Sequence, residues 1–291
     1  MPGGVLMGMT KKEASANYMR EHQDILSCPL CQKEMKVTEE STVICENRHT
    51  FDLAKQGYVN FMTHPAPSMY GSELFNARKK VIDRNLYHLM YETIVEQLNL
   101  YEKDLTVLDT GCGEGSHLVK IKEAYEQSGT YKMHAAGIDI AKEGIVAAAK
   151  NYGGMMWYVG DLAKSPFKDQ SFDCILNILS PANYSEFQRL LKPDGVVVKV
   201  VPQSGYLKEL RDQFFVDEDK KTYSNAKTVE RFKEQFKEVT VARITATLPL
   251  EKELVPDLAH MTPLGWHQKE DINEKSLSKV TIDLDVCIGK F

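Results

Sequence analysis

Two closely spaced pairs of potential metal ligands stand near the start of this chain. The first pair is Cys28-Pro-Leu-Cys31, and the second is Cys45-Glu-Asn-Arg-His49. Cysteine thiolates and a histidine imidazole at this spacing are typical of tetrahedral zinc, and four protein ligands leave no open position for a substrate. The pattern therefore predicts a structural zinc site. A segment this small buries too little surface to fold without the metal.

We expect the zinc segment to be a small ribbon that covers residues 25–63. Residues 33–37 and 42–44 alternate between apolar and polar side chains like two short strands. Residues 1–24 show no clear hydrophobic period and are expected to form an irregular or weakly helical lead-in. Residues 64–103 read as a proline-rich connector followed by a helical segment, because apolar side chains keep helical spacing from 72 to 98.

The composition limits the class of protein. Of 291 residues, 43% are hydrophobic and 26% are charged, which is normal for a globular chain. No apolar run is long enough to span a bilayer and the first residues lack a signal peptide's charged head, so we expect a cytoplasmic protein without a membrane partner. The other three cysteines stand singly, which fits a reducing compartment. A net charge of -5 leaves room only for a local basic face.

Strands and helices alternate over residues 104–291. Strands are expected at 106–109, 133–139, 155–159, 172–178, 195–201, 239–250 and 279–288. Helices are expected at 115–126, 143–150, 184–191, 204–215, 227–237 and 251–261. This alternation implies an α/β domain with a mostly parallel, doubly wound sheet.

A glycine-rich loop follows the first of these strands, with the sequence Asp109-Thr-Gly111-Cys-Gly113-Glu-Gly115. Glycines at a strand-to-helix turn let the backbone approach a ligand closely. A dinucleotide fingerprint would need another glycine where this chain has Ser116. The spacing instead resembles the loop of S-adenosylmethionine-dependent methyltransferases. Another nucleotide ligand, or a loop that has lost its ligand, is the alternative.

Acidic residues at the ends of three successive strands extend this expected cofactor site. In the resemblance, Asp109 faces the amino end of the donor's methionyl group. Asp139 ends the second strand, where its carboxylate could accept hydrogen bonds from both ribose hydroxyls. Asp161 follows the third strand, where the resemblance places an adenine contact. The carboxyl ends of parallel strands share one sheet edge, which is the usual ligand crevice.

With the zinc pattern and the glycine loop together, the chain resembles the RlmA family of bacterial large-subunit rRNA guanine-N1 methyltransferases over nearly its whole length. The matching residues are Cys28-Pro-Leu-Cys31, Cys45, Arg48-His49, Phe51-Asp52, Ala54-Lys55, Gly57-Tyr58-Val59-Asn60, Ala77-Arg78, Tyr87, the glycine loop, Leu191-Lys-Pro-Asp-Gly195 and Met261-Thr-Pro-Leu-Gly-Trp266. The resemblance implies a class I methyltransferase fold, Rossmann-like with a seven-stranded, mostly parallel sheet, behind a small zinc-ribbon domain.

The resemblance also implies an activity and a set of ligands. The chain would methylate N1 of one guanine in a hairpin loop of 23S rRNA, using S-adenosylmethionine, and would carry structural zinc and form a homodimer. Tyr87 and Tyr206 would contact the donor together with the loop residues Gly111, Gly113, Glu114 and Gly115. The sequence does not identify which guanine is the acceptor.

The segment after the fourth strand, Asn177-Ile-Leu-Ser180-Pro181, is where related methyltransferases carry catalytic motifs. It lacks the Asn-Pro-Pro-Tyr or Asp-Pro-Pro-Tyr motif of exocyclic amine methylation, which favours attack by a ring nitrogen. Guanine N1 carries a proton that must leave, but no residue stands out as the general base. Asn177 and Ser180 are the candidates to orient the base edge. A cysteine nucleophile is disfavoured, because Cys174 stands at the start of the strand.

RNA recognition would come from the zinc ribbon and the connector. The cations expected to contact phosphate are Lys33, Lys36, Arg48, Lys55, Arg78, Lys79, Lys80 and Arg84. Phe51, Tyr58 and Phe61 could stack on unpaired bases, or simply pack the ribbon core. Trp266 is expected to pack or to line a cleft. Two other functions stay open: a small-molecule methyltransferase with a structural ribbon, and a non-catalytic zinc-dependent RNA-binding protein.

Overall fold

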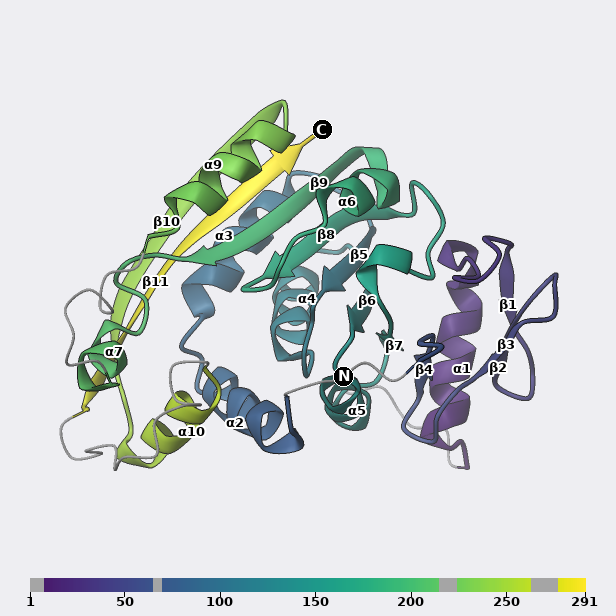
Figure 1. The fold of residues 1–291 in the computed structure, drawn as a ribbon, viewed down its shortest axis with the longest axis horizontal. Helices are drawn as coiled ribbons and strands as arrows, with labels where there is room; N and C mark the ends of the chain where they lie inside the picture. Colours follow the sequence, from purple (N-terminus) through teal and green to yellow (C-terminus); the bar gives the residue numbers. More distant parts are fainter. Residues whose placement is uncertain (1–7, 65–69, 215–223, 263–276) are drawn as a thin grey trace.

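The computed structural model describes residues 8–64, 70–214, 224–262 and 277–291. These residues form an eight-stranded sheet flanked by helices, with a three-stranded sheet beside one edge (Figure 1). Most of the proline-rich connector and Trp266 lie outside the described residues. Within the described ranges, no helix is both long and apolar enough to cross a membrane.

The main sheet has the strand order β10-β11-β9-β8-β5-β6-β7-β4. Its strands are β4 (Tyr58–Asn60), β5 (Leu105–Thr110), β6 (Met133–Asp139), β7 (Met156–Val159), β8 (Phe172–Ile178), β9 (Leu191–Pro202), β10 (Glu238–Pro249) and β11 (Lys279–Lys290). Strand β11 runs antiparallel between β9 and β10, and the other neighbours are parallel. Strands β5 to β11 confirm the expected mostly parallel sheet of seven strands.

The eighth strand, β4, comes from the end of the zinc segment, which the sequence pattern did not predict. It pairs in parallel with β7, with Val59 opposite Tyr158. The zinc ribbon is therefore attached to the methyltransferase-like sheet through a shared edge, and Figure 1 shows the ribbon beyond β7, at the end of the molecule opposite β10.

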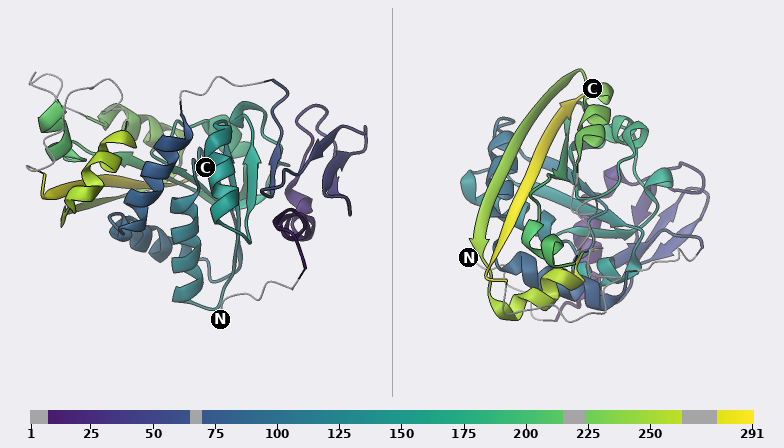
Figure 2. Two further views of the ribbon diagram at one scale, coloured as in Figure 1. Left: turned by 90° about the horizontal axis from the view of Figure 1, so that it is seen from below. Right: turned by 60° about the vertical axis from the view of Figure 1, so that its left-hand side comes forward.

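Helices cover both faces of the main sheet (Figure 2). One face packs against α3 (His88–Asn99), α4 (Ser116–Ser128) and α5 (Lys142–Asn151). The other packs against α6 (Tyr184–Leu190), α9 (Ala226–Gln235) and α1 (Lys11–Glu21). Successive strand residues point to opposite faces, so Val107 joins the first core and Leu108 the second. Burial on both faces explains the nearly continuous apolar runs of these strands. The remaining elements are α7 (Lys208–Phe214), α10 (Val255–His260), η2 (Leu162–Lys164) and η3 (Lys252–Leu254).

The zinc segment is a three-stranded ribbon preceded by a helix. Its elements are α1, η1 (Gln23–Ile25), β1 (Met35–Val37), β2 (Thr42–Cys45) and β3 (Thr50–Asp52). Helix α1 is better formed than the irregular or weakly helical lead-in that the sequence predicted, because Thr10 and Glu13 make a capping box. The side chains of Ala16 and Met19 are buried in the same core as strand β7. The Thr10-Lys-Lys-Glu13 pattern was the local signal for this helix.

The expected helical segment over 72–98 divides into two helices, α2 (Ser72–Asp83) and α3. The break lies at Asn85, whose backbone is left-handed with φ +59°. Asparagine tolerates this conformation better than most residues. The turn places Tyr87 at the amino end of α3, with its side chain buried.

Candidate active site and metal centre

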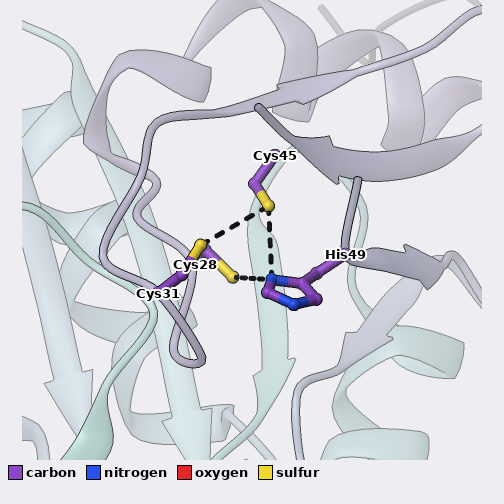
Figure 3. A group of neighbouring side chains, drawn as sticks. All are labelled: Cys28, Cys31, Cys45 and His49. Carbon is purple, nitrogen blue, oxygen red and sulfur yellow. Dashed lines mark hydrogen bonds between the residues drawn. The ribbon is translucent and has the colours of Figure 1, made fainter. Parts of the chain in front are cut away.

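The four expected metal ligands converge on one point, and their ligand atoms lie within 4.8 Å of one another (Figure 3). Cys28 Sγ and Cys45 Sγ each lie 3.5 Å from His49 Nδ1, and Cys31 Sγ lies 3.7 Å from Cys45 Sγ. A tetrahedron with Zn–S bonds of about 2.3 Å and a Zn–N bond of about 2.0–2.1 Å has S···S edges of about 3.8 Å and S···N edges of about 3.5 Å. The ligand set therefore fits a closed, structural zinc ion.

Two tight turns bring the ligands together. After the first pair, Gln32 is left-handed (φ +61°) and its N–H donates to the carbonyl of Cys28. Within the second pair, Arg48 is left-handed (φ +62°) and its N–H donates to the carbonyl of Cys45. A backbone N–H lowers the pKa of the Cys31 thiol, whereas burial raises that of the neighbouring Cys28 thiol.

The glycine-rich loop joins β5 to α4 at the carboxyl edge of the sheet, where the sequence pattern placed it. Gly111, Gly113 and Gly115 all have left-handed backbones, with φ of +73°, +56° and +82°. A Cβ on Gly111 would overlap the Ser180 hydroxyl, and a Cβ on Gly115 would overlap the Trp157 ring. The left-handed backbone and the lack of space for a Cβ therefore both require glycine at Gly111 and Gly115.

Three acidic side chains surround this loop. Asp109 and Glu114 are each only 2% exposed, and Asp109 Oδ1 and Glu114 Oε1 have no hydrogen-bond partner among the described residues. The Asp139 carboxylate accepts from the N–H groups of Gly113 (2.8 Å) and Ala141 (2.7 Å). Burial raises the pKa of all three acids, and the nearby charges of Asp139 and Glu114 raise that of Asp109 further.

Buried carboxylate oxygens without partners are costly unless a ligand satisfies them. A cationic ligand would offset both the missing hydrogen bonds and the mutual repulsion of the acids. S-adenosylmethionine carries an ammonium and a sulfonium, so the residues present fit this donor.

Two tyrosines far apart in the sequence meet beside the loop. Tyr87 and Tyr206 share a hydrogen bond of 2.8 Å between their hydroxyls. Burial raises the pKa of both, so both stay protonated at neutral pH. The Tyr87 ring also meets His117 edge to face, and burial lowers the pKa of His117 to about 3, which keeps that imidazole neutral. The structure thus brings together the two tyrosines that the resemblance assigned to the donor.

Asp139 is the last residue of β6 and Asp161 comes two residues after the neighbouring parallel strand β7, at the same sheet edge. Gly160 lies between them, because its N–H donates to the carbonyl of Asp139 at 3.1 Å. The Asp161 side chain is exposed and accepts from the Ala163 N–H at 2.8 Å, which caps η2. This placement is compatible with the ribose and adenine contacts expected for the two acids.

Lys199 is a buried amine that the sequence reading did not single out. It lies in β9, is 4% exposed, and its Nζ donates to Asn177 Oδ1 (2.6 Å) and to the Ser180 carbonyl (2.9 Å). Asn177 Nδ2 donates in turn to Thr110 Oγ1 (3.1 Å) and the Pro181 carbonyl (2.9 Å). This network ties together the carboxyl ends of β5, β8 and β9. A single lysine inside an otherwise apolar strand was the available sequence signal.

The two candidate acceptor-orienting residues therefore have different positions. Asn177 is fully buried, and both ends of its amide bond to protein groups. Ser180 is partly exposed and lies against Gly111 of the donor loop. Between them, Leu179 has a left-handed backbone (φ +51°) and an exposed side chain. Non-glycine residues with a left-handed backbone are strained, and such residues cluster at functional sites.

Three of the four cations in the cluster Arg78–Arg84, which the sequence analysis assigned to phosphate contact, form ion pairs with acidic side chains. Lys79 pairs with Asp83 (2.6 Å), Lys80 with Asp257 (3.0 Å) and Arg84 with Glu251 (3.3 Å). Arg78 lies over the glycine loop instead, since a Cβ on Gly113 would lie 3.0 Å from its Nη1. The Lys79–Asp83 pair is one helical turn apart on α2 and is local, whereas Glu251 and Asp257 are distant in the sequence and could not be read as partners from the local pattern.

The ribbon aromatics pack against the main domain. The Phe61 ring lies 4.9 Å from Phe51 and 5.7 Å from Tyr158 of β7, centroid to centroid. Tyr58 and Phe61 are 6% and 4% exposed. Their packing role is thus favoured over base stacking.

Comparisons with known proteins match both parts of the chain. The N-terminal zinc-ribbon family of RlmA matches residues 26–65, and a methyltransferase-domain family matches residues 101–255. A Bacillus subtilis protein, YxjB, provisionally named a 23S rRNA (guanine-N1-)-methyltransferase, is 40% identical over 90% of this chain and 95% of its own length. A Streptomyces fradiae protein named 23S rRNA (guanine(748)-N(1))-methyltransferase is 28% identical over 84% of this chain and 87% of its own.

Proposed function

This chain belongs to the RlmA family of S-adenosylmethionine-dependent methyltransferases, and we propose that it methylates N1 of a guanine in a hairpin loop of 23S rRNA. The observation that carries the proposal is the combination, in one chain, of a closed zinc ribbon and an acid-lined glycine loop on a shared sheet. Both relatives named above are 23S rRNA guanine-N1 methyltransferases by name, and each is matched over most of its length.

The methyl donor would lie along the carboxyl edge of β5, β6 and β7. Its ammonium would meet Asp109 and Glu114, and its adenosine would meet Asp139 and Asp161. The glycine loop would carry its backbone, and the hydrogen-bonded pair Tyr87 and Tyr206 would close over the methionyl end. When bound, the donor supplies an activated methyl group on a sulfonium. The residues around it orient that methyl and exclude water.

The acceptor guanine would lie over the loop 177–181. N1 must pass its proton to solvent so that its electron pair can form the bond to the methyl carbon while the bond from that carbon to sulfur breaks in line, which leaves 1-methylguanine and S-adenosylhomocysteine. Ser180 is partly exposed and lies against Gly111 of the donor loop, and we propose that it contacts the base edge. Asn177 and Lys199 hold the loop from beneath and so act as positioning residues.

The zinc ribbon would hold the rRNA through four exposed cations, here called the ribbon cations: Lys33, Lys36, Arg48 and Lys55. None of them forms an ion pair with another residue in the described ranges, unlike three of the four cations at 78–84. Unpaired surface cations can release counterions from phosphate without first breaking a protein contact.

The test of the activity is a transfer assay with isotopically labelled donor and protein-free 23S rRNA, followed by nucleoside digestion and mass spectrometry. We expect label in 1-methylguanosine from 23S rRNA and none from 16S rRNA. Donor binding without transfer to RNA would instead support the small-molecule methyltransferase. Absence of donor binding would support the non-catalytic RNA-binding protein.

The ribbon cations give a second test with a matched control. Changing all four to glutamine should weaken rRNA binding and flatten its salt dependence, since each lost phosphate contact removes about 0.7–0.9 from the slope of log K against log[salt]. The control changes Lys79, Lys80 and Arg84 to glutamine, three cations that already have carboxylate partners. Equal loss in both variants would contradict this choice of RNA-binding face.

A further inference from the structure

We propose that Arg78 binds the α-carboxylate of the methyl donor and so completes a zwitterion site of which Asp109 and Glu114 form the ammonium half. This inference rests on the donor site described above and adds a residue that the sequence reading had assigned to RNA. It concerns only the amino-acid end of the donor, and it can be tested without any acceptor.

The first observation is where α2 puts this side chain. A Cβ on Gly113 would lie 3.0 Å from Arg78 Nη1 and 3.5 Å from the Phe75 ring. The guanidinium lies over the same ring, 5.7 Å from its centroid. A Cβ on Gly144 of α5 would lie 2.7 Å from the Gly113 carbonyl and 2.9 Å from Phe75. Helix α2 therefore presses directly on the donor loop, and Arg78 is the cation that it brings there.

The second observation is the charge around the guanidinium. Burial raises the pKa of Glu114, Asp139, Tyr87 and Tyr206, and the positive charge of Arg78 opposes that rise in all four, so the guanidinium faces the residues that surround the expected donor site. Arg78 nevertheless forms no ion pair with any acid in the described part of the chain. The other cations of this cluster are each paired with a carboxylate. A half-buried guanidinium beside a ligand loop is thus left available for a ligand's carboxylate.

The geometry matches the chemistry of the donor's amino-acid end, which carries one ammonium and one carboxylate. Buried carboxylate oxygens without partners lie at Asp109, where the loop begins, and at Glu114 within the loop. The planar guanidinium lies over the loop and can bind a carboxylate through two parallel hydrogen bonds. Without Arg78, a bound α-carboxylate would be repelled by three neighbouring acids.

The rival reading assigns the opposite role to the same residue. Arg78 would then be a stand-in cation that neutralises the acids until the donor arrives, and it would have to move away. The two readings predict opposite changes in donor affinity when Arg78 is lost. A carboxylate partner predicts that loss of Arg78 weakens donor binding, whereas a stand-in cation predicts that its loss strengthens binding.

The experiment measures affinity by calorimetry for two ligands, S-adenosylmethionine and its decarboxylated analogue, which keeps the ammonium and the sulfonium. Wild-type protein should bind the analogue about 10–100-fold more weakly, the size expected for a bidentate charge-assisted contact. In Arg78→Met this difference should disappear, because only the affinity for the full donor falls. Arg84→Gln, which removes a cation paired with Glu251 on the protein surface, should keep the difference.

Every outcome bears on the assignment. Equal weakening for both ligands in Arg78→Met, or tighter binding of the full donor, overturns it. The comparison of the two ligands on wild-type protein tests the carboxylate contact even if Arg78→Met does not fold, and Arg78→Lys gives a milder second variant. Failure of wild-type protein to bind either ligand would overturn the proposed function itself, which is a separate result.

Discussion

Lys199 gives a quantitative prediction about stability and pH. Burial lowers its pKa from 10.5 to about 8, and the thiol that faces it, Cys287, has its pKa raised by burial to about 11. The unfolded chain therefore holds the lysine proton more tightly than the folded chain does. The sign follows from linkage: between pH 8 and 10.5 the unfolded state binds more protons, so stability rises with pH in that window.

The magnitude comes from the same two values. A pKa shift of this size corresponds to about 3 kcal/mol in the free energy of unfolding. Roughly 2–3 kcal/mol of this should be gained as the pH rises from about 7 to about 10. Lys199→Met fills the same space without a titrating group, so it should remove this pH-dependent part. At neutral pH the variant no longer buries a charged amine, which stabilises it, but it also loses the hydrogen bonds to Asn177 and Ser180. These two effects oppose each other, so its free energy of unfolding at neutral pH should differ little from that of the wild type.

The assay is urea unfolding of the zinc-saturated protein at several pH values, for wild type and Lys199→Met. Other titrations are common to both proteins, so the difference between their free energies of unfolding isolates Lys199. The matched control is Lys192→Met, which removes a partly exposed lysine paired with Asp173 at 2.8 Å. A wild-type-minus-variant difference that stays flat from about pH 7 to about pH 10, or falls, would refute the buried ammonium.

Three further results are expected. Removing zinc with a chelator, or by Cys45→Ala, should abolish amide protection in β1–β3 while the strands β5–β11 keep theirs, and retained protection in β1–β3 would contradict a metal-held ribbon. Gly115→Ala should lower the free energy of unfolding in urea by about 2–4 kcal/mol, because residue 115 has a left-handed backbone and the added Cβ would overlap the indole ring of Trp157. The control Gly129→Ala, where the added Cβ has no neighbour within 4 Å, should lower it by less than about 0.5 kcal/mol. Donor affinity measured by calorimetry should rise with pH through the raised pKa values of Asp109 and Glu114, because a cationic ligand prefers them ionised, and a pH-independent affinity would argue against their role.

Features that depend on a short stretch of sequence could be predicted. The strands at 133–139 and 172–178 have the expected bounds, because each is a mostly apolar segment between polar and turn-forming residues. The glycine loop could be placed because three left-handed positions at one turn leave glycine as the residue that fits. The zinc ligands could be placed because a tetrahedral ion constrains both the ligand type and its spacing.

Features set by distant contacts were not predictable. Strand β4 is only three residues long, and its pairing with β7 depends on a partner about a hundred residues away. The lone lysine in an apolar strand marked Lys199 locally, but its partners, and the position of Arg78 over the glycine loop, depend on how the fold brings distant segments together. Helix α1 is a different case, because its capping box at Thr10 and Glu13 was legible and was missed.

The central claim is tested most directly by locating the modified nucleotide. Protein-free 23S rRNA is incubated with the protein and S-adenosylmethionine and then copied by reverse transcriptase, which stops at a guanine methylated on N1 because base pairing is blocked. We predict one donor-dependent stop, at a guanine in a hairpin loop, that disappears with Asp109→Asn. Donor binding with no stop anywhere in the rRNA would contradict the account and leave the small-molecule methyltransferase in its place.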